Sequence, residues 1–257
     1  MKKIYIATKM IGEAYAEFIK DASPEVEQWL THKLRHTFGV AHEIMNIFYD
    51  EKNVYEMFAP DERELVEMTG ILHDLARFYQ HKNGKIIPSS EFDHGKAAVN
   101  LIKDNPEVSD QKMLFAIHEH NKFAIDYHNP LYCQLEETEK KKAEVLAKLL
   151  RDADKLENIR FFSYYGVERL GIFPQGNLSE AIKQNIKNHQ TVDYKNVRTA
   201  ADSLAVSLSW INDIYFVSTM ECLRKLHFIE NCLDLISQRG ASAEDIDFLR
   251  NNMTYEM

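Results

Sequence analysis

Apolar residues recur at steps of three and four positions along most of this chain, and few helix-breaking residues interrupt them. This spacing gathers side chains on one face of an α-helix, whereas a half-buried strand alternates at every second position. With only 9 Gly and 6 Pro in 257 residues, long helices can form without breaks. We therefore predict an all-α fold. The clearest stripe is Trp29, Lys33, His36, Val40, Ile44 and Ile47.

Local signals place the ends of several predicted helices. Ser23 is a predicted N-cap with Pro24 at the first helical position, and Ser109 is a predicted N-cap further along. The only weak strand-like alternation is KIYIA at residues 3–7, and GIFPQGN at residues 171–177 is a predicted loop. After the helix that starts at Ser23, the predicted helical segments are 61–80, 93–103, 109–121, 136–162 and 196–238.

The size of the chain bounds its domain organisation. With 257 residues and 45% hydrophobic content, it can bury one sizeable core. The sequence contains no obvious internal repeat, low-complexity segment or linker. We predict a single domain over residues 1–257, with a helical core over 24–160 and a helical extension over 161–257 packed on that core.

Charge and cysteine content narrow the partners and the compartment. The 40 Asp and Glu against 31 Lys and Arg give a formal charge of −9, which argues against coating duplex nucleic acid but leaves a small nucleotide open. Cys133, Cys222 and Cys232 form no close pair, as expected in a reducing cytoplasm. No run approaches the roughly 18–20 apolar residues of a membrane span, and the apolar start is too short for a signal peptide. We expect a cytoplasmic protein with no membrane partner.

Potential metal ligands recur on successive predicted helices, and 11 histidines are many for this length. Helix bundles build metal sites in this way, from inward side chains of different helices. Imidazole and carboxylate together suit Mn, Fe, Ni, Co, Zn or, with more oxygen ligands, Mg. The sequence therefore predicts a site for one or two divalent ions. The candidate ligands are His36, the adjacent pair His73 and Asp74, His94, His118, His120, Asp152 and Asp154.

Spacing alone leaves two choices open among these candidates. Asp152 flanks the apolar stripe of its helix at least as closely as Asp154 does. His118 and His120 lie two positions apart, so they point to different faces of their helix. Each pair therefore offers two alternative ligands.

The candidates also carry a resemblance to a known family. His36, the pair His73–Asp74 and the segment RDADKLE at residues 151–157 resemble the H…HD…D signature of the HD-domain metal-dependent phosphohydrolase superfamily. The segments DHGKAAVNLI and AIHEHNK resemble a branch with further histidines, so that the resemblance covers roughly residues 30–160. It implies a helical bundle of the HD-domain type with a helical C-terminal extension.

The resemblance implies an assignment of the ligands. It matches four side chains to the first metal: His36, His73, Asp74 and Asp154. In two-metal members of the superfamily, the positions of His94 and His120 hold a second ion, and the aspartate of the HD pair bridges the two. The motif thus selects Asp154 over Asp152, His120 over His118, and His36, which is followed by Val40, over His32.

The implied chemistry is hydrolysis of a phosphate mono- or diester, a nucleotide among the candidates, by water activated on a divalent ion. Asp74 is the implied central ligand, Arg77 a candidate clamp on the phosphate and Lys155 a candidate to neutralise its charge. Lys122, close to His120, is a further candidate for the last role. Arg77 also has a plain structural interpretation as an ion-pair partner of Asp74.

Two other classes of function fit the same residues. A diiron HD-type oxygenase would need His94 and His120 as ligands of a second iron, together with an oxygen-dependent reaction. A non-catalytic nucleotide-binding module would keep the fold, but it would be expected to lose ligands. The predicted partner is a small phosphorylated substrate, and a homo-oligomer stays open.

Overall fold

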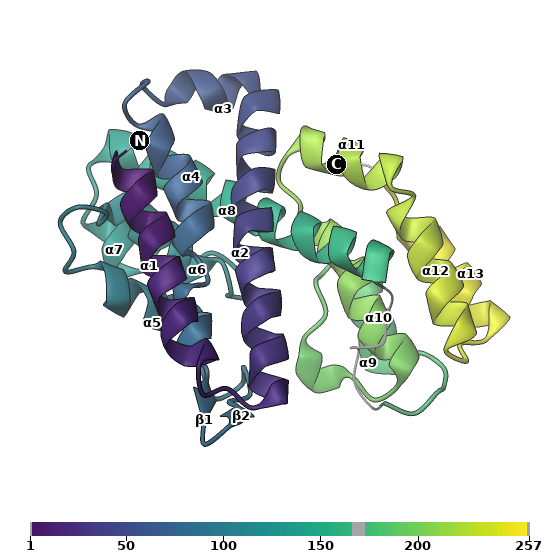
Figure 1. The fold of residues 1–257 in the computed structure, drawn as a ribbon. Coiled ribbons are helices and arrows are strands. Elements are labelled where there is room, and N and C mark those ends of the chain that lie inside the picture. Colours follow the sequence, from purple (N-terminus) through teal and green to yellow (C-terminus); the bar gives the residue numbers. More distant parts are fainter. Residues whose placement is uncertain (1, 166–172, 256–257) are drawn as a thin grey trace. The chain divides into compact units, whose positions relative to one another are not determined.

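The computed structural model describes residues 2–165 and 173–255, without the side chains of residues 161–165. Within these ranges the regular structure is helical apart from one short hairpin, β1 (His81–Lys82) with β2 (Lys85–Ile86), so the all-α prediction is confirmed (Figure 1). None of the helices in this part of the chain is both long and apolar enough to cross a membrane. The chain divides into two compact units, residues 1–154 and 155–257.

The first unit is built around α2, the helix that starts at the predicted cap. Ser23 Oγ accepts the Val26 amide at 3.4 Å and Pro24 opens the helix, as predicted. Helix α2 packs against α4, which also packs against α1, while α5 packs against α6. The elements of this unit are α1 (Lys2–Ile19), α2 (Pro24–Asp50), α3 (Lys52–Met57), α4 (Arg63–Leu72), the 3₁₀ helix η1 (Leu75–Tyr79), α5 (His94–Ile102), α6 (Gln111–Glu119), α7 (Pro130–Cys133) and the first part of α8 (Glu137–Tyr165).

One local prediction, the cap at Ser109, is wrong, and the weak strand-like pattern at 3–7 does not form a strand. The segment 3–7 lies in α1, because Ala7 begins a buried stripe that continues with helical spacing at Ile11 and Ala14. The cap of α6 is Asp110, whose Oδ1 accepts the Lys112 amide at 2.9 Å. The neighbouring Ser109 hydroxyl instead donates to a backbone carbonyl in the preceding turn.

The helix predicted over residues 61–80 is interrupted at its centre. Helix α4 ends at Leu72, Asp74 leaves the helical conformation with φ −105° and ψ 15°, and η1 then begins at Leu75. Apolar spacing continues across this break, so the sequence pattern does not reveal it. The consequence is that His73 and Asp74 lie at a helix end, where two neighbouring side chains are not held to the fixed angle of a helix interior.

The second unit is also helical, as predicted for residues beyond 177. Its central helix, α10, is buried along most of its length and begins with a capping box, in which Asp202 N donates to Thr199 Oγ1 at 3.0 Å. The predicted loop at 171–177 is described only from residue 173. Residues 173–179 contain no helix. Its elements are the end of α8, α9 (Glu180–Lys187), η2 (Tyr194–Asn196), α10 (Ala200–Ser209), η3 (Trp210–Asp213), α11 (Val217–Lys225), α12 (Phe228–Gln238) and α13 (Ala243–Asn252).

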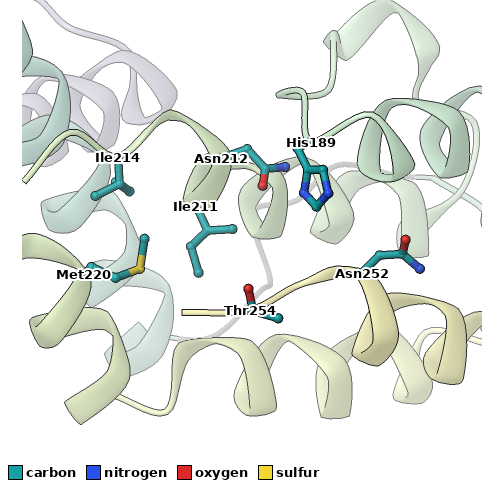
Figure 2. A pocket seen from close by; sticks show the side chains of 7 residues that line it. All are labelled: His189, Ile211, Asn212, Ile214, Met220, Asn252 and Thr254. Carbon is teal, nitrogen blue, oxygen red and sulfur yellow. The ribbon is translucent and has the colours of Figure 1, made fainter. Parts of the chain in front are cut away.

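A pocket of about 320 Å³ opens within the second unit (Figure 2). It is lined by His189, Ile211, Asn212, Ile214, Met220, Asn252 and Thr254. Only one of these side chains is titratable, so the pocket offers no acid–base pair. Two predictions are not tested: that residues 161–257 pack on the core, and that the whole chain is a single domain.

Gly70 sets how closely α4 approaches α2. A Cβ at this position would lie 2.7 Å from Ala41 Cα and 2.9 Å from Ile44 Cγ2, so a larger residue would push the helices apart. Because α2 carries His36 and α4 ends beside His73, this contact also sets the distance between those two imidazoles.

We predict that Gly70→Ala lowers the free energy of unfolding by about 1–3 kcal/mol, because backbone atoms must move to admit the methyl group. Gly12→Ala is the matched control, since Gly12 lies in α1 with no atom within 4 Å of its added Cβ. That change should raise stability by about 0.5–1 kcal/mol through helix propensity. Urea unfolding followed by circular dichroism measures both, and a stabilising Gly70→Ala would contradict the close-contact argument.

Candidate metal centre

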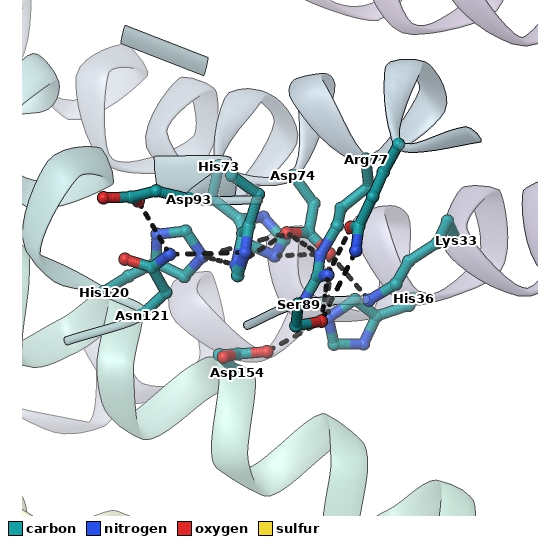
Figure 3. Close-up of polar contacts among 12 residues, drawn as sticks. Lys33, His36, His73, Asp74, Arg77, Ser89, Asp93, His120, Asn121 and Asp154 are labelled. Carbon is teal, nitrogen blue, oxygen red and sulfur yellow. Dashed lines mark hydrogen bonds and ion pairs between the residues drawn. The ribbon is translucent and has the colours of Figure 1, made fainter. Parts of the chain in front are cut away.

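The six ligands predicted from the sequence lie together in the first unit, where the four histidines surround Asp74 and Asp154 lies beside His36 (Figure 3). They come from four helices and the break after α4: His36 from α2, His73 and Asp74 from the break, His94 from the first residue of α5, His120 from the residue after α6, and Asp154 from α8. All but Asp154 are buried. His73, His94 and His120 lie at helix ends, whereas His36 lies within the buried stripe of α2.

One oxygen of Asp74 faces a first group of ligands. Asp74 Oδ2 lies 3.6 Å from His36 Nε2 and 3.7 Å from His73 Nε2. The Asp154 carboxylate also belongs to this group, because its Oδ1 lies 3.0 Å from His36 Nε2. Metal–ligand bonds of about 2.1 Å place neighbouring ligand atoms roughly 3–3.5 Å apart, so these separations suit a shared ion.

The other oxygen of Asp74 faces a second group. Asp74 Oδ1 lies 3.6 Å from His94 Nε2 and 3.7 Å from His120 Nε2, and the two imidazole nitrogens are 3.1 Å apart. The three side chains form a compact, buried set of potential ligand atoms. Asp74 therefore belongs to both groups, with one oxygen in each.

The structure separates the pairs of alternatives that spacing leaves open. His118 turns away and contacts Glu119 Oε1 through Nδ1 at 2.6 Å, whereas His120 faces the second group. Asp154 is the aspartate next to His36, while Asp152 is fully buried elsewhere along α8. These positions agree with the choice made from the motif, and the roles of the residues as metal ligands stay predictions.

Hydrogen bonds orient two of the imidazoles toward the cluster. His73 Nδ1 donates to the Gly70 carbonyl at 2.7 Å, and His120 Nδ1 donates to the Ile117 carbonyl at 2.6 Å. In this tautomer each Nε2 has a lone pair, which is the form that binds a metal. The His73 Nε2 atom is buried and has no hydrogen-bond partner among the described residues. An orphaned, buried nitrogen beside a carboxylate fits a divalent ion.

Burial favours the neutral form of two histidines, whereas neighbouring cations keep the Asp74 carboxylate ionised. It lowers the pKa of His73 to about 4 and that of His94 to about 2. Burial by itself would raise the pKa of Asp74, but the charges of Lys33 and Arg77 hold it well below its usual value. Neutral imidazoles and an anionic carboxylate are the protonation states that metal ligands require.

Lys33 is a site residue that the sequence did not single out. It lies one turn before His36 on α2, and its Nζ donates to Asp74 Oδ2 at 2.9 Å. The ammonium is almost fully buried. The available signal was a lysine on the predicted buried stripe of the helix, where a charge needs a partner.

The three cations singled out from the sequence lie in different surroundings. Arg77 Nε is 3.5 Å from Asp74 Oδ1, and its Nη1 donates to Ser89 Oγ at 3.0 Å. Lys122 pairs with Asp93, the N-cap of α5. Lys155 belongs to the second unit, where its Nζ is 2.7 Å from the Asp213 carboxylate.

Arg151 is a second residue that the sequence did not single out. Its buried guanidinium donates to carbonyls at the end of α6 and in the segment that follows, including Glu119 O at 2.9 Å and Lys122 O at 2.7 Å. Further bonds reach the carbonyls of His120 and Phe123. Arg151 thus fixes the backbone that carries His120. Bonds to backbone carbonyls leave no sequence signature, so spacing could not have found this role.

Comparison with protein families supports the assignment. A family model for the HD domain matches residues 34–159, which include all six predicted ligands. Residues 34–159 of this chain form an HD domain. This places the chain in the HD metal-dependent phosphohydrolase superfamily. Neither a search of curated proteins nor one of solved structures finds a significant match.

We predict that Arg151→Met lowers the free energy of unfolding by about 3 kcal/mol, because buried carbonyls lose a charged donor. It should also weaken metal binding at the second group by about 10–100-fold, since the backbone that orients His120 loosens. Arg250→Met is the control, as it removes an exposed pair with Asp247 and should change stability by less than about 1 kcal/mol. Denaturant unfolding and metal titration measure both effects. Equal behaviour of the two variants would contradict the positioning role of Arg151.

Proposed function

We propose that this HD domain is a metal-dependent phosphohydrolase that cleaves a phosphate mono- or diester with an activated water. The observation that carries the proposal is the Asp74 carboxylate, which presents one oxygen to His36 and His73 and the other to His94 and His120. A divalent ion held by these side chains and Asp154 would lower the pKa of a bound water and stabilise negative charge on phosphate oxygens.

The side chains next to Asp74 support an anionic substrate. Arg77 is a guanidinium beside the ligand cluster, and its Nη1 is oriented by Gln80 Oε1 and Ser89 Oγ. A guanidinium with a fixed orientation suits phosphate, because its planar N–H groups match two phosphate oxygens. Lys155 is engaged with Asp213, so its role in neutralising substrate charge stays a prediction.

A diiron oxygenase is the second candidate, favoured by the second group of ligands. His94, His120 and Asp74 Oδ1 supply what a second ion would require. A non-catalytic module is less favoured, because the ligand set is complete and compact. We retain a small phosphorylated molecule, a nucleotide among the candidates, as the expected partner and the cytoplasm as the expected location.

A substrate panel tests the proposed function. Phosphate mono- and diesters, including nucleotides, are incubated with the protein and Mn, Fe, Ni, Co, Zn or Mg, with and without oxygen. We predict hydrolysis that needs a metal and is unaffected by oxygen. His73→Ala should lower kcat/KM by at least about 100-fold, whereas His128→Ala, at an exposed histidine, should leave it unchanged.

Two results would redirect the assignment. A product formed only with oxygen would favour the oxygenase. No turnover with any ester, metal or gas phase would favour the binding module.

A further inference from the structure

Three side chains next to Asp74 form a group of their own. Lys33 Nζ donates to Asp74 Oδ2 at 2.9 Å, and Arg77 Nε lies 3.5 Å from Asp74 Oδ1, so two cations approach one carboxylate from its two oxygens (Figure 3). Trp29 completes the group: its ring centroid is 5.2 Å from Lys33 Nζ and 5.7 Å from Arg77 Cζ. Trp29 and Lys33 lie one turn apart on α2, while Arg77 comes from η1.

This group has more hydrogen-bond donors than acceptors. The buried Arg77 Nε and Trp29 Nε1 atoms have no hydrogen-bond partner among the described residues. Lys33 has three N–H groups and donates to one acceptor, Asp74, within the same part of the chain. A buried donor without an acceptor costs about 1–3 kcal/mol, so two such donors beside an ammonium with further N–H groups indicate that this place suits an additional acceptor.

The charge of the group points to the same kind of partner. Lys33 and Arg77 carry two positive charges, which balance the carboxylates of Asp74 and Asp154, and a bound divalent ion would leave the site with an excess of two positive charges. Both cations are mostly withdrawn from water, with 8% and 13% of their side chains exposed. Solvent therefore screens the excess positive charge weakly, and an anion with several oxygens is the complementary ligand.

We propose that Lys33, Arg77 and Trp29 bind the terminal phosphate of a phosphate monoester and make the monoester the preferred substrate over the diester. This inference rests on the proposed hydrolase function of the same site. Near neutral pH a monoester phosphate carries a charge close to −2, with a second pKa of about 6, and presents three terminal oxygens. A diester carries a single charge and two free oxygens, so it satisfies fewer of the unpartnered donors.

A purely structural role for Lys33, as the counterion of Asp74, makes a different prediction. It requires only a positive charge for stability and gives no preference between a dianion and a monoanion. Binding of inorganic phosphate and of dimethyl phosphate to the Mn²⁺-loaded protein, measured by calorimetry with metal content determined in parallel, separates the two roles.

We expect wild type to bind inorganic phosphate at least about tenfold more tightly than dimethyl phosphate, the effect of one further charge-assisted hydrogen bond. Lys33→Met should lose at least that factor for inorganic phosphate only, and Lys33→Arg should restore most of it. Trp29→Phe keeps the aromatic ring but removes its N–H, and should weaken phosphate binding about fivefold. Lys112→Met is the control, because Lys112 is also a largely buried, ion-paired lysine, with partners in Glu62, Asp110 and Glu139.

The inference is overturned if Trp29→Phe binds inorganic phosphate as tightly as wild type does, or if a folded Lys33→Met either binds it as wild type does or weakens binding of both ligands equally. Trp29→Phe keeps the test valid should Lys33→Met fail to fold. Selective phosphate binding without turnover of any ester would overturn the proposed hydrolase function and leave this binding site standing. Turnover of esters with equal kcat/KM for monoesters and diesters would support the hydrolase function and overturn the inferred monoester preference.

Discussion

The buried carboxylate of Asp74 is the constraint on which the first unit depends. An ionised carboxylate withdrawn from water is unfavourable unless charges and donors surround it. Here Lys33 donates to one oxygen and Arg77 lies beside the other, while imidazole nitrogens approach both. The arrangement that offsets the burial of Asp74 is therefore the same one that would hold divalent ions and an anionic substrate.

The backbone around Asp74 serves this arrangement. The end of α4 at Leu72 frees Asp74 from helical geometry, and Gly70 allows α4 to approach α2 closely. Arg151 donates hydrogen bonds to the carbonyls of the segment that carries His120. Ligands held by packed backbone keep their separations, which is what ordered metal binding and catalysis require.

Much of the fold and the identity of the candidate ligands could be predicted from the sequence, because both follow from periodic or ordered patterns. The all-α prediction rested on helical spacing. The order of the HD motif selected His120 over His118 and Asp154 over Asp152 as predicted ligands. The break before Asp74 was not predictable, since apolar spacing runs through it. Lys33 left one signal, a lysine on the predicted buried stripe, but its pairing with Asp74 and the backbone contacts of Arg151 arise only when distant segments meet.

The most direct test of a shared, metal-binding Asp74 is the metal content of the purified protein. Wild type loaded with Mn²⁺ and then desalted should retain at least one ion per chain, measured by inductively coupled plasma mass spectrometry. Asp74→Ala should retain none, because both groups lose their common ligand, while Asp234→Ala, at an exposed aspartate in α12, should match wild type. Equal metal in wild type and Asp74→Ala, with both folded by circular dichroism, would contradict the account.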